Sequence, residues 1–156
     1  MPPIDDDPEL RLFFLDEAEA LAESILGILQ RFLNGDASES AFEELRRGFH
    51  TLKGGAAQMS GCDSLYCCAE KAERLAQGIQ RRLVVASPAL LGLLADAARA
   101  NVELISAARM SGVMPAYSLQ LRERLERANQ RVLEADRRAM SADGPAPLPQ
   151  LIDDAV

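Results

Sequence analysis

Several residue types are scarce in this chain of 156 residues. It contains no tryptophan, a single histidine and only 4% aromatic residues, whereas the strands of sandwiches and barrels are usually rich in aromatic and β-branched side chains. Alanine, leucine, glutamate and arginine dominate instead, and this mixture favours helices. With 48% hydrophobic residues the chain can bury the core of one domain. We therefore expect an all-α fold.

Cysteine and basic residues are also limited, and this excludes several functions. Cys62, Cys67 and Cys68 are too few and too clustered for the disulfide framework of a secreted protein, and with one histidine they lack the spacing of a metal finger. We read them as small buried or half-buried side chains and expect no metal site. A net charge of −7 disfavours nucleic acid as a partner. The sequence shows neither an apolar run of ~18 residues nor the pattern of a signal peptide, so we expect a cytoplasmic protein with no membrane partner.

Apolar residues recur at helical spacing in five stretches of the chain. Capping residues, prolines and glycines mark the helix ends: Asp7-Pro8, Asn34-Gly35, Asp36 with Glu39, Ser40 with Glu43, Gly61, Asp63 or Ser64, Ser87-Pro88 and Gly112. Short connections join the first four stretches and predict antiparallel neighbours. We expect an antiparallel four-helix bundle over about residues 8–110.

The rest of the chain divides into an extra helix and a tail. A fifth stretch, about residues 116–139, is highly charged with a thin apolar stripe, which suits an outer C-terminal helix. Together with the bundle it would complete one domain over residues 1–140. Residues 141–156, "SADGPAPLPQLIDDAV", are rich in proline and alanine and predict a linker or a disordered tail.

The segment "FHTLKGGA", residues 49–56, contains the only histidine. Each glycine inside a helix costs about 1 kcal/mol relative to alanine, so two consecutive glycines indicate a role beyond folding. His50 follows the core residue Phe49 by one position, about 100° around the helix, and is therefore expected on the flank or the surface.

A carboxylate is expected beside His50 across the hairpin of the second and third helices. If the antiparallel pair turns near Gly61-Cys62, the position level with residue 50 is residue 73, which is Glu73. A shift of the turn by two residues would bring Glu70 there instead.

A carboxylate in this place has a clear chemical use. If it accepts a hydrogen bond from Nδ1, it fixes the imidazole tautomer and leaves the lone pair of Nε2 available as a nucleophile. It also stabilises the positive charge that develops on the ring during attack on phosphorus. On the residues alone, the pattern fits phosphoryl transfer at His50 about as well as it fits an ordinary solvated surface histidine.

The residues around this histidine form a basic collar with a gap. Lys53 lies one turn further on and is expected to contact phosphoryl oxygens. Arg46 and Arg47 would act in the same way or face an acidic partner. Gly54 has no side chain and leaves a gap, and the small side chain of Ala57 leaves the same face of the helix accessible. Arg46, Arg47 and Ala57, together with the glutamate at position 70, are our candidates for partner contacts.

The segment "FHTLKGGAAQMSG" resembles the phosphorylation motif of histidine-containing phosphotransfer (HPt) domains, most closely those at the N-terminus of chemotaxis histidine kinases of the CheA type. "FLDEAEALAESILGIL" is similar to their first helix and "CAEKAERLAQGIQ" to their third, so the resemblance covers about residues 8–110. It implies that His50 accepts phosphate, that Glu73 orients its ring, and that Lys53 is the motif lysine. Gly54 would give a response regulator access.

The resemblance also implies partners for this chain, although the sequence differs from such domains at two places. ATP on a CheA-type kinase catalytic domain, in cis or in trans, would supply the phosphate. The phosphate would then pass to the aspartate of a CheY-type response regulator, whose own acidic site binds Mg²⁺. The chain has no P-loop or kinase glycine-rich motif, so we expect a carrier without a cofactor, part of a larger histidine kinase. The segment "AAQMSGCD" is one residue longer than in such relatives, and Glu70 stands where they often have a second histidine.

Three alternatives stay open. The closest is an HPt module of a phosphorelay outside chemotaxis, although the charged fifth helix and the pattern of the first helix favour the chemotaxis kinase. The chain would also serve as a structural adaptor that binds partner helices through its fifth helix, with His50 incidental. A bundle with a di-iron carboxylate site is disfavoured, because that site needs Glu-x-x-His pairs and the chain has one histidine.

Overall fold

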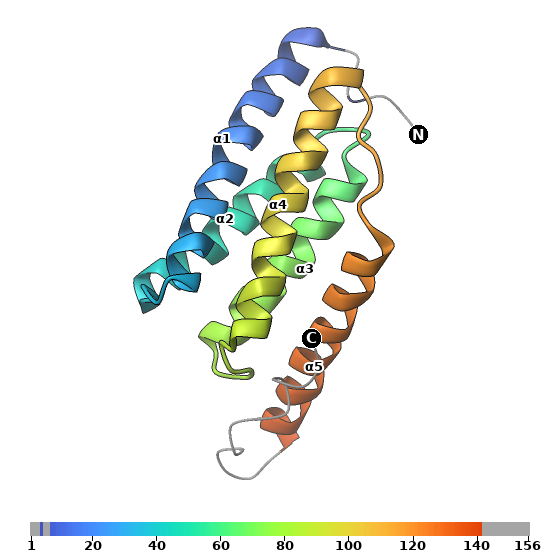
Figure 1. Ribbon diagram of the computed structural model, residues 1–156. Helices are drawn as coiled ribbons and strands as arrows, with labels where there is room; N and C mark the ends of the chain where they lie inside the picture. Colours follow the sequence, from blue (N-terminus) through green and yellow to red (C-terminus); the bar gives the residue numbers. More distant parts are fainter. Residues whose placement is uncertain (1–3, 5–6, 142–156) are drawn as a thin grey trace.

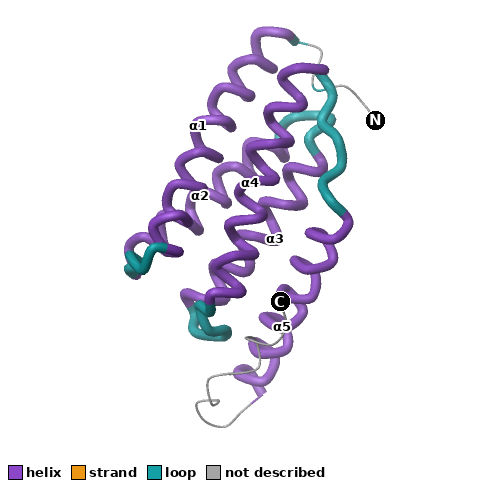
Figure 2. The backbone as a smooth tube through the Cα atoms, in the orientation of Figure 1, coloured by secondary structure: helices purple, strands orange, loops and turns teal. Residues whose placement is uncertain are grey.

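The computed structural model describes residue 4 and residues 7–141 of the chain. These residues form five helices: α1 (Pro8–Leu33), α2 (Glu39–Ala57), α3 (Asp63–Gln80), α4 (Pro88–Ser111) and α5 (Leu119–Ser141). Figure 2 shows that short loops join the helices and that the described part of the chain contains no strand. The expectation of an all-α fold is confirmed.

Four helices surround a shared core, and the fifth lies along the outside. From α1 to α4, consecutive helices run in opposite directions (Figure 1). α1 packs against α2 and α4, and α3 packs against α2, α4 and α5. The pair α2 and α3 therefore forms an antiparallel hairpin, and this hairpin carries the histidine.

The starts of α1, α2 and α4 are capped by side chains. Asp7 and Ser87 accept hydrogen bonds from backbone N–H groups at the starts of α1 and α4, as predicted. The cap of α2 is Ser38, which accepts from the backbone of the first turn at 3.2 Å, so the capping boxes predicted at Asp36 and Ser40 were wrong. Ser40 already lies inside the first turn, where its hydroxyl contacts that of Ser38. Such a cap contributes about 1 kcal/mol.

Two helix ends differ from the sequence prediction. α2 ends at Ala57 instead of continuing to Gly61, which lies in the turn with a φ of 80°, a left-handed conformation that suits glycine. α5 begins at Leu119 because Ser118 accepts a hydrogen bond from the backbone of its first turn. The predicted tail lies outside the described residues, except for Ser141, which ends α5.

The predicted apolar stripes form the core of the bundle. Phe49 and Leu52 of α2 are buried, and three small residues of α3, Ala69, Ala72 and Ala76, are completely buried beside them. Burial of a leucine or phenylalanine contributes about 1.5–3 kcal/mol. The alanines let neighbouring helices approach closely.

Two glycines mark the closest helix contacts. A Cβ on Gly48 would lie 2.8 Å from Cγ1 of Ile25, so α1 and α2 touch at this point. A Cβ on Gly78 would lie 2.8 Å from Cγ2 of Val132, so α3 and α5 also touch. At these two points α1 packs closely against α2 and α5 packs closely against α3.

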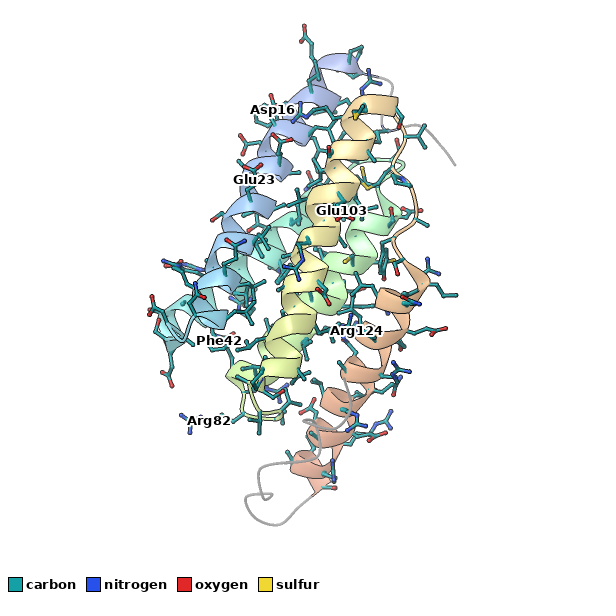
Figure 3. All side chains as sticks on the ribbon, viewed as in Figure 1. Asp16, Glu23, Phe42, Arg82, Glu103 and Arg124 are labelled. Carbon is teal, nitrogen blue, oxygen red and sulfur yellow. The ribbon has the colours of Figure 1, made fainter. Side chains whose placement is uncertain are left out.

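Polar contacts at the rim join α5 to its neighbours. Three ion pairs connect it to α3 and α4: Lys71–Glu126 (2.5 Å), Arg81–Asp136 (2.8 Å) and Arg124–Asp96 (2.9 Å). Arg124, labelled in Figure 3, lies between α5 and α4. Surface pairs contribute at most about 1 kcal/mol each, so the apolar stripe of α5, with Leu121 and Leu125 buried, carries most of the packing energy.

The cysteines divide into two environments. Cys62 and Cys68 are completely buried, as predicted, but Cys67 is exposed, so the prediction was wrong for that residue. Burial raises the pKa of the Cys68 thiol to about 12. All three are free thiols.

Candidate phosphoacceptor site

His50 lies on α2 at the seam with α3. Its side chain is 61% exposed, although the preceding Phe49 is completely buried. Nδ1 of the ring lies 2.7 Å from Oε2 of Glu73, which is 23 residues further along the chain on α3. The side chain of Glu73 is only 11% exposed. A buried carboxylate therefore holds an exposed imidazole by one of its two nitrogens.

The register of the hairpin brings these residues together. Phe49 and Ala72 are completely buried in the seam, and His50 and Glu73 each follow by one position, which turns them to the same flank. This is the arrangement that counting from the turn predicted. Glu70, the competing candidate, instead accepts a hydrogen bond from its own helix, at 3.1 Å from Nη2 of the arginine four residues on.

The tautomer of the imidazole follows from the charge of Glu73. Burial raises the pKa of Glu73, but hydrogen bonds from Lys53 and then His50 outweigh burial, so the pKa lies below its ordinary value of 4.5. At neutral pH the group is a carboxylate, which only accepts hydrogen bonds. In the neutral imidazole the proton therefore lies on Nδ1 and the lone pair on Nε2. Nε2 is the atom placed to act as a nucleophile.

Lys53 occupies the second oxygen of the same carboxylate. Its Nζ lies 2.6 Å from Oε1 of Glu73, and its side chain is 22% exposed. The ammonium group compensates the charge of a carboxylate that would be costly to bury alone. The predicted contact of Lys53 with phosphoryl oxygens stays a prediction, since here the lysine binds Glu73.

Arg46 turns toward carboxylates and not toward solvent. Its Nη2 and Nε lie 2.5 and 3.3 Å from the two oxygens of Glu43, and its side chain is 25% exposed. Its Nη1 lies 4.0 Å from Oε2 of Glu73, the same oxygen that contacts the histidine. Gln80 of α3 donates to Oε2 of Glu43 at 2.7 Å. The hydrogen bonds from Arg46 and then Gln80 lower the pKa of Glu43 to about 2.

The remaining sequence candidates lie at the edge of the site. Arg47 is exposed, with Nε 3.9 Å from Oε1 of Glu43. Gly54 and Ala57 are also exposed. A Cβ on Gly54 would meet no described atom within 4 Å, so the predicted gap is present. Nothing in the structure tests whether these residues contact a partner.

Sequence reasoning missed Glu43 and Gln80. Glu43 precedes His50 by seven residues, and Gln80 follows Glu73 by seven, so each lies two helical turns from the site on the same flank. The two contacts, His50 with Glu73 and Glu43 with Gln80, therefore share one hairpin register. That spacing was the available signal.

Two features are absent from the part of the chain that the structure describes. No group of three or more histidine, cysteine, aspartate or glutamate side chains is arranged to hold a metal ion. No helix is long and apolar enough to cross a membrane.

Comparison with known proteins gave no match to a family model, a curated protein or a solved structure. The functional interpretation therefore depends on the motif and on the geometry of the site.

Proposed function

We propose that this chain is a CheA-type HPt domain, an antiparallel four-helix bundle with a fifth helix, in which His50 carries a phosphoryl group. The observation that carries the proposal is the 2.7 Å contact between Nδ1 of His50 and the buried carboxylate of Glu73. An incidental surface histidine needs no buried partner on a neighbouring helix. This contact fixes the tautomer that leaves Nε2 nucleophilic, next to a helix surface that Gly54 keeps open.

Phosphorylation would begin with ATP held by a CheA-type kinase catalytic domain, in cis or in trans. The lone pair of Nε2 attacks the γ-phosphorus, a nitrogen–phosphorus bond forms, and ADP leaves with the electrons of the broken oxygen–phosphorus bond. The proton on Nδ1 stays in its hydrogen bond, and the negative charge of Glu73 stabilises the positive charge on the ring. No proton needs to leave the imidazole in this step.

Transfer to a CheY-type response regulator reverses this step. A carboxylate oxygen of the receiver's aspartate attacks phosphorus, the nitrogen–phosphorus bond breaks, and its electron pair returns to Nε2. The aspartate and its Mg²⁺ belong to the receiver. HPt modules outside chemotaxis share this chemistry, so the partner assay below also separates those two readings.

The surface for the receiver is expected on the α1–α2 side of His50. A Cβ on Gly55 would lie 3.4 Å from Cε1 of Phe14, so the first turns of α1 lie beside the last turns of α2. There Leu10 and Phe13 expose apolar surface, and the side chain of Phe13 is one of the most exposed large apolar side chains of α1. Exposed apolar side chains on the first turns of α1, which lie beside the last turns of α2, suit a protein partner. We place this encounter in the cytoplasm.

The first test uses phosphoramidate, a small phosphodonor that needs no kinase. The folded protein and His50→Gln, whose helical content is first checked by circular dichroism, are treated side by side and digested for mass spectrometry. We expect acid-labile, base-stable phosphate on residue 50 of the wild type alone. No modification of the folded wild type would overturn the proposal and favour the helical adaptor.

A second assay identifies the partners. A CheA-type kinase catalytic fragment with labelled ATP supplies the phosphate, and purified receivers are then added. We expect rapid loss of label to a CheY-type receiver. Equal transfer to every receiver would argue against the chemotaxis assignment.

A further inference from the structure

Two hydrogen-bond donors, the imidazole of His50 and the guanidinium of Arg46, approach the same oxygen of Glu73. Nδ1 of His50 lies 2.7 Å from Oε2, and Nη1 of Arg46 lies 4.0 Å from it. Lys53 already occupies Oε1 at 2.6 Å. Imidazole and guanidinium therefore compete for one acceptor, and the imidazole now has the closer position.

Arg46 would be the stronger competitor if it were free to move. A guanidinium is always charged and forms strong hydrogen bonds to carboxylates at about 2.7–2.9 Å, so a shift of about 1 Å would bring its Nη1 into full contact. The neutral imidazole of His50 donates a weaker hydrogen bond through Nδ1. Because His50 nevertheless lies closer to Oε2 of Glu73 than Arg46 does, another residue must hold Arg46 away.

Glu43 is the residue that holds Arg46. It binds Arg46 through two of the guanidinium nitrogens, at 2.5 and 3.3 Å, and draws the group away from Glu73. We call this contact of Glu43 with Arg46 the clamp. Gln80 of α3 stabilises it by donating a hydrogen bond to Glu43 at 2.7 Å. The clamp is thus tied to both helices of the hairpin.

We infer that Glu43 is a positioning residue that restrains Arg46, so that His50 keeps its contact with Oε2 of Glu73. The kinetic consequence rests on the proposed phosphoryl transfer, whereas the tautomer of the ring does not. Without Glu43, Arg46 takes Oε2, the imidazole loses its fixed acceptor, and its proton distributes between Nδ1 and Nε2. The nucleophilic lone pair is then present on Nε2 only part of the time and in a less defined direction.

The test combines two substitutions singly and together. Glu43→Ala removes the clamp, and alanine is at least as good a helix former. Arg46→Met keeps the apolar stem but removes the competing cation. The control is Asp96→Ala, because Asp96 and Arg99 form the same i,i+3 pair on α4, which does not pack against α2.

The two readouts are the rate of phosphorylation by phosphoramidate and the ¹⁵N shifts of the imidazole. The chain has one histidine, so its ring signals need no assignment, and they are recorded above the titration range of free histidine. We expect Glu43→Ala to slow phosphorylation about three- to tenfold and to add the Nε2–H tautomer. The double variant should stay within about twofold of Arg46→Met, the Asp96 control should stay within about twofold of the wild type, and all three should keep Nδ1–H.

The decisive comparison is between Glu43→Ala and the double variant. Recovery of both the rate and the tautomer in the double variant supports the restraint of Arg46. A double variant as impaired as Glu43→Ala, or a Glu43→Ala protein with an unchanged tautomer, overturns it. If phosphoramidate labels no variant but the tautomers change as expected, the proposed function fails and the restraint stands.

Discussion

Lys53 and Glu73 form an ion pair 2.6 Å long across the hairpin of α2 and α3, in which the lysine side chain is 22% and the glutamate side chain 11% exposed. The pair occupies Oε1 of the carboxylate, while the ring of His50 occupies Oε2. Lys53 therefore compensates the charge of the buried carboxylate at Oε1, whereas Oε2 orients the imidazole of His50. This division allows each contribution to be measured separately.

Loss of Lys53 should affect stability. In Lys53→Met the carboxylate of Glu73 stays buried without its cation, and we expect the free energy of unfolding to fall by about 1–3 kcal/mol in urea titrations. The control is Lys71→Met, which removes the chain's only other lysine from a pair with the more exposed Glu126 and should cost less than about 1 kcal/mol. Equal losses in the two variants would contradict a special role for the buried pair.

The two glutamates that the sequence left in competition should behave differently. Glu73→Gln removes the negative charge that fixes and stabilises the ring of His50, so phosphorylation by phosphoramidate should slow about tenfold or more. In the wild type the carboxylate of Glu70 pairs with an arginine of its own helix. Glu70→Gln should therefore react at close to the wild-type rate. A slow Glu70→Gln protein beside a fast Glu73→Gln protein would reverse the assignment.

Gly54 should show opposite effects on stability and on partner transfer. A Cβ there meets no described atom, so Gly54→Ala should raise the free energy of unfolding by about 0.5–1 kcal/mol through helix propensity alone. Gly54→Leu should be phosphorylated normally by phosphoramidate but transfer phosphate more slowly to a receiver protein. Normal transfer from Gly54→Leu would show that the partner does not approach over this residue.

Acid should weaken the fold partly through Glu73. Its pKa in the folded protein lies below the ordinary 4.5, so the unfolded chain binds the proton more readily. The stabilisation is therefore complete above about pH 4.5 and is lost as the pH falls through the lower, folded-state value. Urea titrations between neutral pH and pH 3 should show a shallower loss of stability in Glu73→Gln than in the wild type. Identical slopes would place the acid sensitivity elsewhere.

Local rules accounted for most of the helical fold. The caps at Asp7 and Ser87, the stop at Asn34 and the apolar stripes appear in the structure as predicted, because each depends on a few neighbouring residues. The cap of α2 was misplaced because several polar residues with similar capping ability occur together between residues 36 and 40, and packing of the helix decides among them. Cys67 was misjudged because its exposure depends on which sides of α3 the neighbouring helices cover.

The sequence by itself determined that the chain is helical, that His50 follows a core residue, and that a glutamate on the next helix would lie level with it. Helical periodicity and the length of one turn suffice for these conclusions, since both are local quantities. Only the tertiary structure decided that Glu73 and not Glu70 faces the ring, that Lys53 binds the same carboxylate, and that Arg46 is held by Glu43. Those choices depend on the rotation of α2 against α3 to within a fraction of a turn, which is fixed by packing of the whole core.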